Sequence, residues 1–333
     1  MNHFPIAYYL PEATLSNDEL AALYPGWTAD KIQAKTGIRQ RHVSAPDECA
    51  SDLAAQAVKR LFAETACDPA SIDFILLATQ SPDYTLPTTA CLLQHRLGLP
   101  QTAGALDFNL GCSAYVYGLA LAKGLVASGV ARKILLVMAE TYSKRIHPMD
   151  KSVRTIFGDA AAVTQIDAAA AERIGQFVLG TDGSGAEHLI VPAGGARKRL
   201  AGAACPETTD ESGNVRTEAH LFMNGPEIFT FTIATIPRLV RETLARNNLR
   251  QEEIDLFVFH QANQYMLDFL RKKIGIPENR FVVDLEDCGN TVSASIPIAL
   301  RRSADKGILK KGDRVMLVGF GVGLSWGATV ITW

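Results

Sequence analysis

Two segments of this chain repeat one plan, and this internal duplication constrains the fold more than any other feature of the sequence. In each segment an amphipathic run and a polar loop precede a short apolar run that opens with Ile-Asp, at residues 72–80 and again at residues 254–261. The correspondence continues downstream, where residues 107–112 and residues 284–290 each lead into a later helical pattern. A duplicated chain folds into two similar halves, so the sequence predicts a pseudo-two-fold molecule.

Short apolar runs alternate with helical patterns along the chain, which is typical of layered α/β proteins. The apolar runs, such as residues 134–138 and 315–319, are continuous and therefore indicate strands covered by helices on both faces. A small-residue stretch at residues 167–172 predicts the boundary between an N-terminal half, 1–167, and a C-terminal half, 168–333. Helices are expected over residues 51–66, 88–97, 112–128, 225–247, 263–274 and 291–306.

Composition excludes several classes of function. The 333 residues carry a formal net charge of −2, which argues against a nucleic-acid partner. The first residues lack the pattern of a secretory signal, and no apolar run approaches the roughly 18–20 residues of a membrane span. The six cysteines are scattered, without a Cys-x-x-Cys pair or a Cys/His cluster, so we expect no metal site and a cytoplasmic location with free thiols. The irregular segment 192–217 reads as a surface excursion.

Cys112 is the candidate nucleophile. It precedes a run of small and apolar residues, 113–122, that predicts a buried helix. A cysteine in the first turn of a helix meets unpaired backbone N–H groups and the positive end of the helix dipole, which favour the reactive thiolate. Taken alone, a free cysteine is more often a small buried hydrophobe than a nucleophile.

Two further residues stand at element ends in matching parts of the two halves. His260 ends the apolar run 256–259, and a side chain at the carboxyl end of such a strand points toward the crevice where α/β proteins bind ligands. Asn290 lies in a tight turn before another helix, where it could also be an ordinary N-cap. Cysteine, histidine and asparagine together are suited to acyl-thioester chemistry. A glycine-rich segment, 319–327, could bring backbone N–H groups close to a substrate oxyanion.

At these residues the chain resembles the β-ketoacyl-[acyl-carrier-protein] synthase III group of thiolase-fold condensing enzymes. The resemblance covers nearly the whole length. It implies a duplicated five-layer α/β/α/β/α fold, a homodimer, and coenzyme A or acyl-carrier-protein thioesters as substrates, with no cofactor. The matching segments are residues 36–42, Cys112 with its helix, and residues 156–160, 260–263, 289–291 and 319–323.

The resemblance implies a decarboxylative Claisen condensation. Cys112 would become acylated by a primer thioester, and the backbone N–H groups of Cys112 and Val322 would hold the tetrahedral oxyanion. A malonyl thioester would then lose CO2, while His260 and Asn290 hydrogen-bond the developing enolate oxygen. Substitution of His260 by alanine should therefore spare acylation more than condensation.

The resemblance also implies substrate contacts. Asn263 would contact the pantetheine arm, and Phe320 would lie beside the nucleophile. Leu86 falls where the family has a residue that lines the acyl pocket, often from the partner subunit. Since leucine is smaller than phenylalanine, we expect acyl chains longer than acetyl to fit.

The chain departs from the family where coenzyme A is held. Lys31 stands in place of a tryptophan, and Lys35, Lys151 and Tyr265 stand in place of arginines. Lysine keeps the charge but loses the planar fork that fits phosphate. A carrier-protein donor, or a differently held acyl-CoA, is therefore open, and the sequence favours a specialised homologue over a housekeeping one. The basic group 271–273 could dock an acidic carrier protein, or it could be a solvated face.

Two other functions remain open at this stage. Some members of the superfamily transfer the acyl group to a hydroxyl or amine without forming a carbon–carbon bond. The chain could also be a partner subunit of a heterodimeric condensing enzyme, although such subunits usually lose the nucleophile that this chain keeps. A hydroxymethylglutaryl-type synthase would need a general-base carboxylate early in the chain, and neither Glu48 nor Asp52 has a clear placement for that role.

Overall fold

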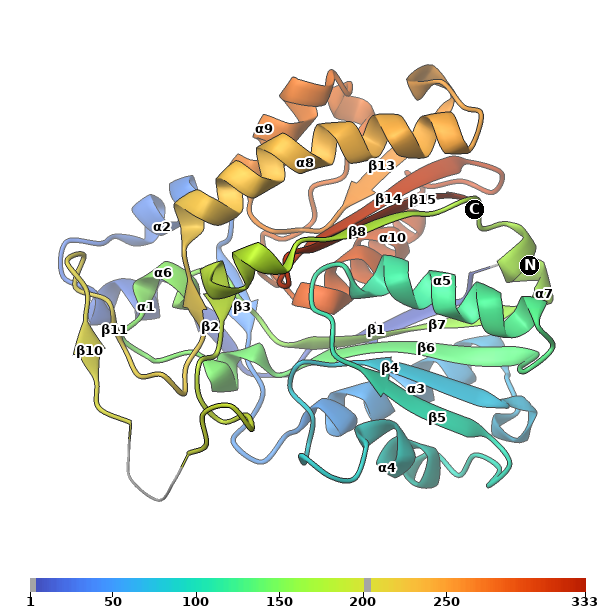
Figure 1. Ribbon diagram of the computed structural model, residues 1–333, viewed down its shortest axis with the longest axis horizontal. Coiled ribbons are helices and arrows are strands. Elements are labelled where there is room, and N and C mark those ends of the chain that lie inside the picture. Colours follow the sequence, from blue (N-terminus) through green and yellow to red (C-terminus); the bar gives the residue numbers. More distant parts are fainter. Residues whose placement is uncertain (1–3, 201–204) are drawn as a thin grey trace.

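The computed structural model describes residues 4–200 and 205–333 and has five layers. Two sheets lie roughly parallel to each other, with helices between them and on both outer faces (Figure 1). This is the duplicated α/β/α/β/α arrangement that the family resemblance implies. No helix among the described residues is long and apolar enough to cross a membrane.

The first sheet takes all of its strands from the first part of the chain. Its order is β1-β7-β6-β4-β5, in which β4 is parallel to β5 and β6, while β7 is antiparallel to both of its neighbours, β6 and β1. Strands β4 and β6 are buried along almost their whole length, as their continuous apolar sequences predict. The strand bounds are β1 Ile6–Tyr9, β4 Phe74–Ala78, β5 Gly104–Phe108, β6 Lys133–Glu140 and β7 Ala160–Asp167.

The second sheet repeats this pairing with later strands. Its order is β13-β14-β15-β8, with β13 parallel to β14 and the other neighbours antiparallel. A parallel bridge from Phe257 to Phe281 occupies the place that β5 fills in the first sheet. The same succession of parallel and antiparallel pairs in both sheets is the physical form of the duplication read from the sequence. The strand bounds are β8 Val178–Thr181, β13 Leu256–Phe259, β14 Arg314–Gly321 and β15 Ser325–Thr332.

The expected helices are present in the three helical layers. Helices α3 and α4 cover the outer face of the first sheet, α8 and α9 that of the second, and α5 and α10 lie between the sheets (Figure 1). Their bounds are α3 Ala50–Thr65, α4 Thr89–Arg96, α5 Ala114–Ala127, α8 Gly225–Arg246, α9 Gln264–Ile274 and α10 Ser295–Asp305. Two predicted starts are early: Cys112 lies in the turn before α5, and a short 3-10 helix, Val292–Ala294, precedes α10.

The central position of α5 follows from its sequence. The helix is apolar around most of its circumference, and such a helix is stable only when it is covered on several sides. Gly118 lets it approach the first sheet closely, because a Cβ at this position would lie 2.5 Å from Leu136 Cδ1. Helix α5 therefore contacts β6 of one sheet and β14 of the other.

Smaller elements cover one end of the molecule. The excursion predicted at residues 192–217 contains the hairpin of β10 and β11, and its residues 201–204 lie outside the described part of the chain. The small-residue stretch after β7 forms helix α7. The remaining bounds are β2 Thr14–Ser16, α1 Asn17–Leu23, α2 Ala29–Thr36, β3 Gln40–His42, α6 Lys151–Arg154, α7 Ala168–Glu172, β9 Leu189–Ile190, β10 Thr208–Thr209, β11 Val215–Arg216 and β12 Phe222–Met223.

Replacing Gly319 by alanine should destabilise the fold. A Cβ there would lie 2.9 Å from both the carbonyl oxygen of Cys112 and Ser113 Cα, which are backbone atoms that cannot rotate away. We expect a loss of about 1–3 kcal/mol in the free energy of unfolding, measured by urea denaturation. Gly124→Ala is the matched control, because its Cβ would meet nothing within 4 Å, and helix propensity predicts a gain of about 0.5–1 kcal/mol. Equal stability of the two variants would contradict this account.

Candidate active site

Cys112, His260 and Asn290 line one cavity of about 570 Å³. Each stands at the end of an element: Cys112 between β5 and α5, His260 directly after β13, and Asn290 before the 3-10 turn that leads into α10. Cys112 and Asn290 thus occupy corresponding positions, each ahead of one of the two central helices. The structure brings together the three residues that the sequence singled out.

The thiol of Cys112 lies against glycines of β14. A Cβ on Gly321 would lie 2.9 Å from Cys112 Cβ and 3.0 Å from its Sγ, so only glycine leaves room for the nucleophile here. Burial raises the pKa of the Cys112 thiol well above its usual value, the nearby Glu140 raises it further, and the Cys112 backbone N–H lowers it only in part. The stabilisation of a thiolate at the helix start, which the sequence predicts, is therefore smaller than the cost of burying the charge. The nucleophile rests as a neutral thiol.

His260 is a neutral imidazole. Burial lowers its pKa to about 3. Its Nδ1 lies 2.8 Å from Ser295 Oγ, and that hydroxyl donates its hydrogen to the Val292 carbonyl at 2.9 Å. Because Ser295 has only one hydrogen to give, the arrangement that also satisfies the Val292 carbonyl has Nδ1 carry the proton and donate it to Ser295. The lone pair of His260 is then on Nε2.

Asn290 is fixed with its amide nitrogen toward His260. Its Oδ1 accepts a hydrogen bond from the Val292 backbone N–H at 2.9 Å. This assigns oxygen and nitrogen, and it places Nδ2 3.4 Å from His260 Nε2. The contact is long for a hydrogen bond, so a substrate oxygen between the two nitrogens could replace it with two shorter ones.

A buried carboxyl group, Glu140, lies behind the nucleophile and was not foreseen. It accepts hydrogen bonds from the Gln80 backbone N–H at 3.0 Å, Ser293 Oγ at 3.0 Å and Ser81 Oγ at 3.3 Å. Burial raises its pKa to about 8, although these hydrogen bonds lower it in part. The available signal in the sequence was a carboxylate that closes the apolar run of β6. Ser295, the partner of His260, was also missed, because nothing local distinguishes it from other serines near a helix start.

Other predicted residues lie at the cavity or beside it. Asn263 and Phe320 line it, and the Phe320 ring is edge-on to His260 at 5.6 Å between centroids. The Asn263 side chain also caps α9 by accepting the Met266 N–H at 2.9 Å. Val322 lines a neighbouring cavity of about 620 Å³ together with Gln80. The role of the Val322 N–H stays a prediction.

Three predicted substrate contacts do not join the cavity within this chain. Leu86 is 84% exposed. Lys35 Nζ lies over the Trp27 ring, 5.3 Å from its centroid, and Lys151 donates a hydrogen bond to the Ser212 carbonyl. Their roles toward substrate stay predictions. Among residues 4–200 and 205–333 no group of three His, Cys, Asp or Glu side chains is arranged to hold a metal ion.

A duplicated five-layer fold with a cysteine, a neutral histidine and an amide donor at one cavity defines the class of thiolase-type acyl-thioester enzymes. Comparison with known proteins agrees. Residues 106–183 match the family described as 3-oxoacyl-[acyl-carrier-protein] synthase III, and residues 244–333 match the C-terminal part of the same family. The chain belongs to the 3-oxoacyl-[acyl-carrier-protein] synthase III family.

Individual members of this family are similar to the chain over nearly its full length. The β-ketoacyl-[acyl-carrier-protein] synthase III of Caldanaerobacter subterraneus subsp. tengcongensis is 38% identical over 98% of this chain and 95% of its own. A crystal structure described as 3-oxoacyl-(acyl-carrier-protein) synthase III is 54% identical with a TM-score of 0.97, covering 100% of both chains. The priming β-ketosynthase of the R1128 polyketide biosynthetic pathway is 29% identical with a TM-score of 0.84, covering 98% of this chain and 94% of that one.

The neutral state of His260 predicts a pH-dependent contribution to stability. An unfolded histidine binds a proton below about pH 6.5, whereas folded His260 binds one only below about 3. Between these values the unfolded state holds more protons, so this group's contribution is lost as pH falls from 6.5 toward 3. From pH 7 to pH 5 we expect wild type to lose about 2 kcal/mol more unfolding free energy than His260→Gln, measured by urea denaturation.

The control for this experiment is His95→Gln, which replaces an exposed histidine of α4. Parallel pH profiles of wild type and His260→Gln would contradict a neutral, buried His260.

Proposed function

We propose that this protein catalyses a decarboxylative Claisen condensation between an acyl group carried on Cys112 and a malonyl thioester. The observation that carries the proposal is the pair of nitrogens, Asn290 Nδ2 and His260 Nε2, that face each other across 3.4 Å in the cavity of the nucleophile. A site that stabilises an enolate needs two such groups around one oxygen. Transfer of the acyl group to a hydroxyl or amine could use His260 as a proton acceptor, but it forms no enolate for the pair to hold.

The first half-reaction is transfer of the acyl group. The sulfur of Cys112 bonds to the acyl carbon, the bond from that carbon to the donor sulfur breaks, and the thiol proton leaves with the donor thiol. Because the resting thiol is neutral, it needs a group to accept its proton, and the lone pair on His260 Nε2 is such a group in the same cavity. The backbone N–H groups of Cys112 and Val322 are the proposed oxyanion donors.

The second half-reaction forms the carbon–carbon bond. The malonyl C–CO2 bond breaks, CO2 departs, and the electron pair passes through the enolate into a new bond to the acyl carbon. The bond from that carbon to Cys112 breaks and releases the sulfur as a thiolate, which takes a proton from solvent to return to the resting thiol. Negative charge develops on the malonyl thioester oxygen. That oxygen, placed between His260 and Asn290, would accept hydrogen bonds from both, provided that His260 carries its proton on Nε2.

Ser295 supplies the means for this change of tautomer. Its Oγ lies within hydrogen-bond distance of both His260 Nδ1, at 2.8 Å, and the Val292 carbonyl, at 2.9 Å. Rotation of the hydroxyl toward Nδ1 lets the imidazole carry its proton on Nε2 instead. With the site empty, that state would set Nε2–H against the Asn290 amide N–H. With a substrate oxygen between them, it is the favoured state.

Further features of the protein are part of this proposal. We propose the two halves 1–167 and 168–333 as its structural units, a homodimer as its assembly and the cytoplasm as its location. In such a dimer the exposed Leu86 would be free to reach the acyl pocket of the partner. Acyl-CoA or acyl-carrier protein is the proposed donor, with malonyl-carrier protein as acceptor.

Intact-protein mass spectrometry tests the reaction directly. The protein is mixed with acyl-pantetheine, acyl-CoA and acyl-carrier-protein thioesters of graded chain length, and then with malonyl-carrier protein. We expect an acyl mass gain that the malonyl donor removes, with a 3-oxoacyl product and CO2, and none of this in Cys112→Ala. His260→Ala removes an enolate donor, so condensation should fall by roughly 10²–10³. Acylation loses a proton acceptor but should fall less, because the departing donor sulfur can itself take the thiol proton. A gain that the malonyl donor leaves in place would favour the acyl-transfer alternative, and no gain with any donor would favour a partner subunit.

Replacing Ser295 by alanine should slow condensation more than acylation. The alanine removes both the acceptor of the resting Nδ1 proton and the hydroxyl that can donate to Nδ1, but only condensation requires the proton on Nε2. We expect condensation to fall about tenfold or more, against a smaller change in acylation, in single-turnover measurements. Ser295→Thr keeps the hydroxyl and should restore most of the rate. Equal losses in both half-reactions, with no rescue by threonine, would reduce Ser295 to a packing residue.

A further inference from the structure

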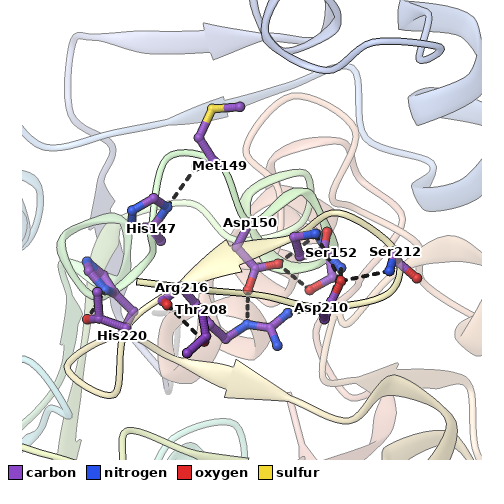
Figure 2. Close-up of polar contacts among 11 residues, drawn as sticks. His147, Met149, Asp150, Ser152, Thr208, Asp210, Ser212, Arg216 and His220 are labelled. Atoms are coloured by element: carbon purple, nitrogen blue, oxygen red, sulfur yellow. Dashed lines mark hydrogen bonds and ion pairs between the residues drawn. The ribbon is translucent and has the colours of Figure 1, made fainter. Parts of the chain in front are cut away.

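An arginine bridge fastens the hairpin β10–β11 to the body of the protein at one end of the catalytic cavity. Figure 2 shows Arg216 between Asp150 and Asp210: its Nε donates to Asp150 Oδ2 at 2.8 Å and its Nη2 to Asp210 Oδ2 at 2.8 Å. The Asp150 side chain is 1% exposed and that of Arg216 15%, whereas that of Asp210 is 35% exposed. The bridge therefore leads from the interior to the solvent.

The hairpin turn is held rigidly by Asp210. The Asp210 carboxylate accepts the backbone N–H groups of Ser212 and Asn214, each at 2.9 Å, and the Asn214 side-chain amide. Burial raises its pKa, but the hydrogen bonds from Asn214 and Arg216 more than offset this and bring it to about 2. The carboxylate is thus ionised at any ordinary pH.

The hairpin also binds Lys151, the lysine that the family resemblance places among the residues that hold the acyl donor. Lys151 Nζ donates to the Ser212 carbonyl in the turn, and the Val215 N–H donates to the Met149 carbonyl at 3.3 Å. Lys151 is therefore engaged with the hairpin and does not face the cavity. Among the described residues that line this cavity, Arg216 is the one cation, and two carboxylates share it.

These contacts discriminate between two kinds of acyl donor. Acyl-CoA and acyl-carrier protein present the same pantetheine arm, but coenzyme A adds a nucleotide with several phosphate charges. Phosphates need unshared cationic donors, above all arginine. At this end of the cavity a nucleotide would meet the Asp210 carboxylate and Arg216, a cation already paired with Asp210 and with the buried Asp150. Like charges in contact are strongly disfavoured.

The pantetheine arm, by contrast, has a free partner in the hairpin. Asn214 lines the cavity and is 6% exposed, and none of the described residues donates to its Oδ1. A buried acceptor without a donor costs about 1–3 kcal/mol unless a ligand satisfies it. The arm carries two amide N–H groups, which are donors of the kind that this acceptor lacks.

We propose that the β10–β11 hairpin, fastened by Arg216, selects the acyl donor: it admits a pantetheine arm delivered by a carrier protein and disfavours coenzyme A. This inference rests on the proposed acylation of Cys112 and names its donor. The step is the thioester exchange described above, with the pantetheine thiol of the carrier protein as the leaving group.

The test compares donors that share one acyl group. Cys112 acylation is followed by intact-protein mass spectrometry with acyl-CoA, acyl-pantetheine and acyl-carrier protein, using the acyl length that charges wild type fastest. In wild type, acyl-pantetheine and acyl-carrier protein should react about tenfold or more faster than acyl-CoA at equal concentration. A faster reaction with the carrier protein than with free acyl-pantetheine would show that the carrier protein itself is bound.

Two variants link this preference to the hairpin. Asp210→Asn keeps a turn-capping side chain but removes its charge and releases Arg216 Nη2. In the second variant, an Asn-Gly turn replaces residues 210–214, which removes Asp210, Ser212 and Asn214 while leaving Arg216 on Asp150. Both should bring the ratio of acyl-pantetheine to acyl-CoA rates close to one. Asp182→Asn is the matched control, because Asp182 caps another turn by accepting the Ser184 N–H at 3.0 Å and does not line the cavity.

The outcomes separate the two proposals. Wild type that reacts with acyl-CoA as fast as with acyl-pantetheine overturns the donor preference while leaving the condensing function intact. The same holds if Asp210→Asn, shown by circular dichroism to be folded, keeps the wild-type ratio, so the result does not depend on the shortened hairpin folding. Absence of Cys112 acylation by every donor overturns the proposed function, and the donor preference falls with it.

Discussion

The close contact between strand β14 and the turn that carries Cys112 is the constraint on which the rest of the site depends. Glycines at 319 and 321 leave no room for a side chain there, since a Cβ at either position would lie about 3 Å or less from atoms of Cys112. A hydrogen bond of 2.7 Å between Ser113 Oγ and Ser325 Oγ fixes the same junction. The nucleophile, contributed by one sheet and its helix, is in this way placed against the other sheet, whose neighbouring strand β13 ends at His260.

Burial at this junction sets the chemistry of the site. Dehydration disfavours charge, so Cys112 and His260 rest neutral and Glu140 is protonated up to a pH of about 8. Between neutral groups, the direction of each hydrogen bond decides what the site can do, and the partners of the neutral groups set that direction. Ser295 sets the proton on His260, and the Val292 N–H sets the orientation of Asn290. A malonyl carboxylate that must leave as uncharged CO2 is well served by a cavity without charge at its base.

Charge returns only at the outer end of the cavity, where Arg216 joins Asp150 and Asp210. The division is physically reasonable, because the reacting centre needs neutral donors, while the outer end is where we propose that acyl donors of different charge are distinguished. The hairpin is anchored by backbone and ionic contacts that do not involve Cys112, His260 or Asn290. Donor choice and chemistry can therefore vary independently on one scaffold.

The sequence by itself determined the duplicated fold and the apolar strands with their covering helices. It also singled out Cys112, His260 and Asn290 as candidates. These features can be recognised in short stretches of chain, because hydrophobic periodicity and the ends of helices and strands are local properties. The sequence also predicted the excursion at residues 192–217, but not that this segment folds back over the cavity. Only the tertiary structure decided the neutral thiol, the tautomer of His260 and the engagement of Lys151, since each depends on burial or on a partner distant in the chain. A pKa and a hydrogen-bond direction are properties of surroundings, and surroundings exist only once the two halves have packed together.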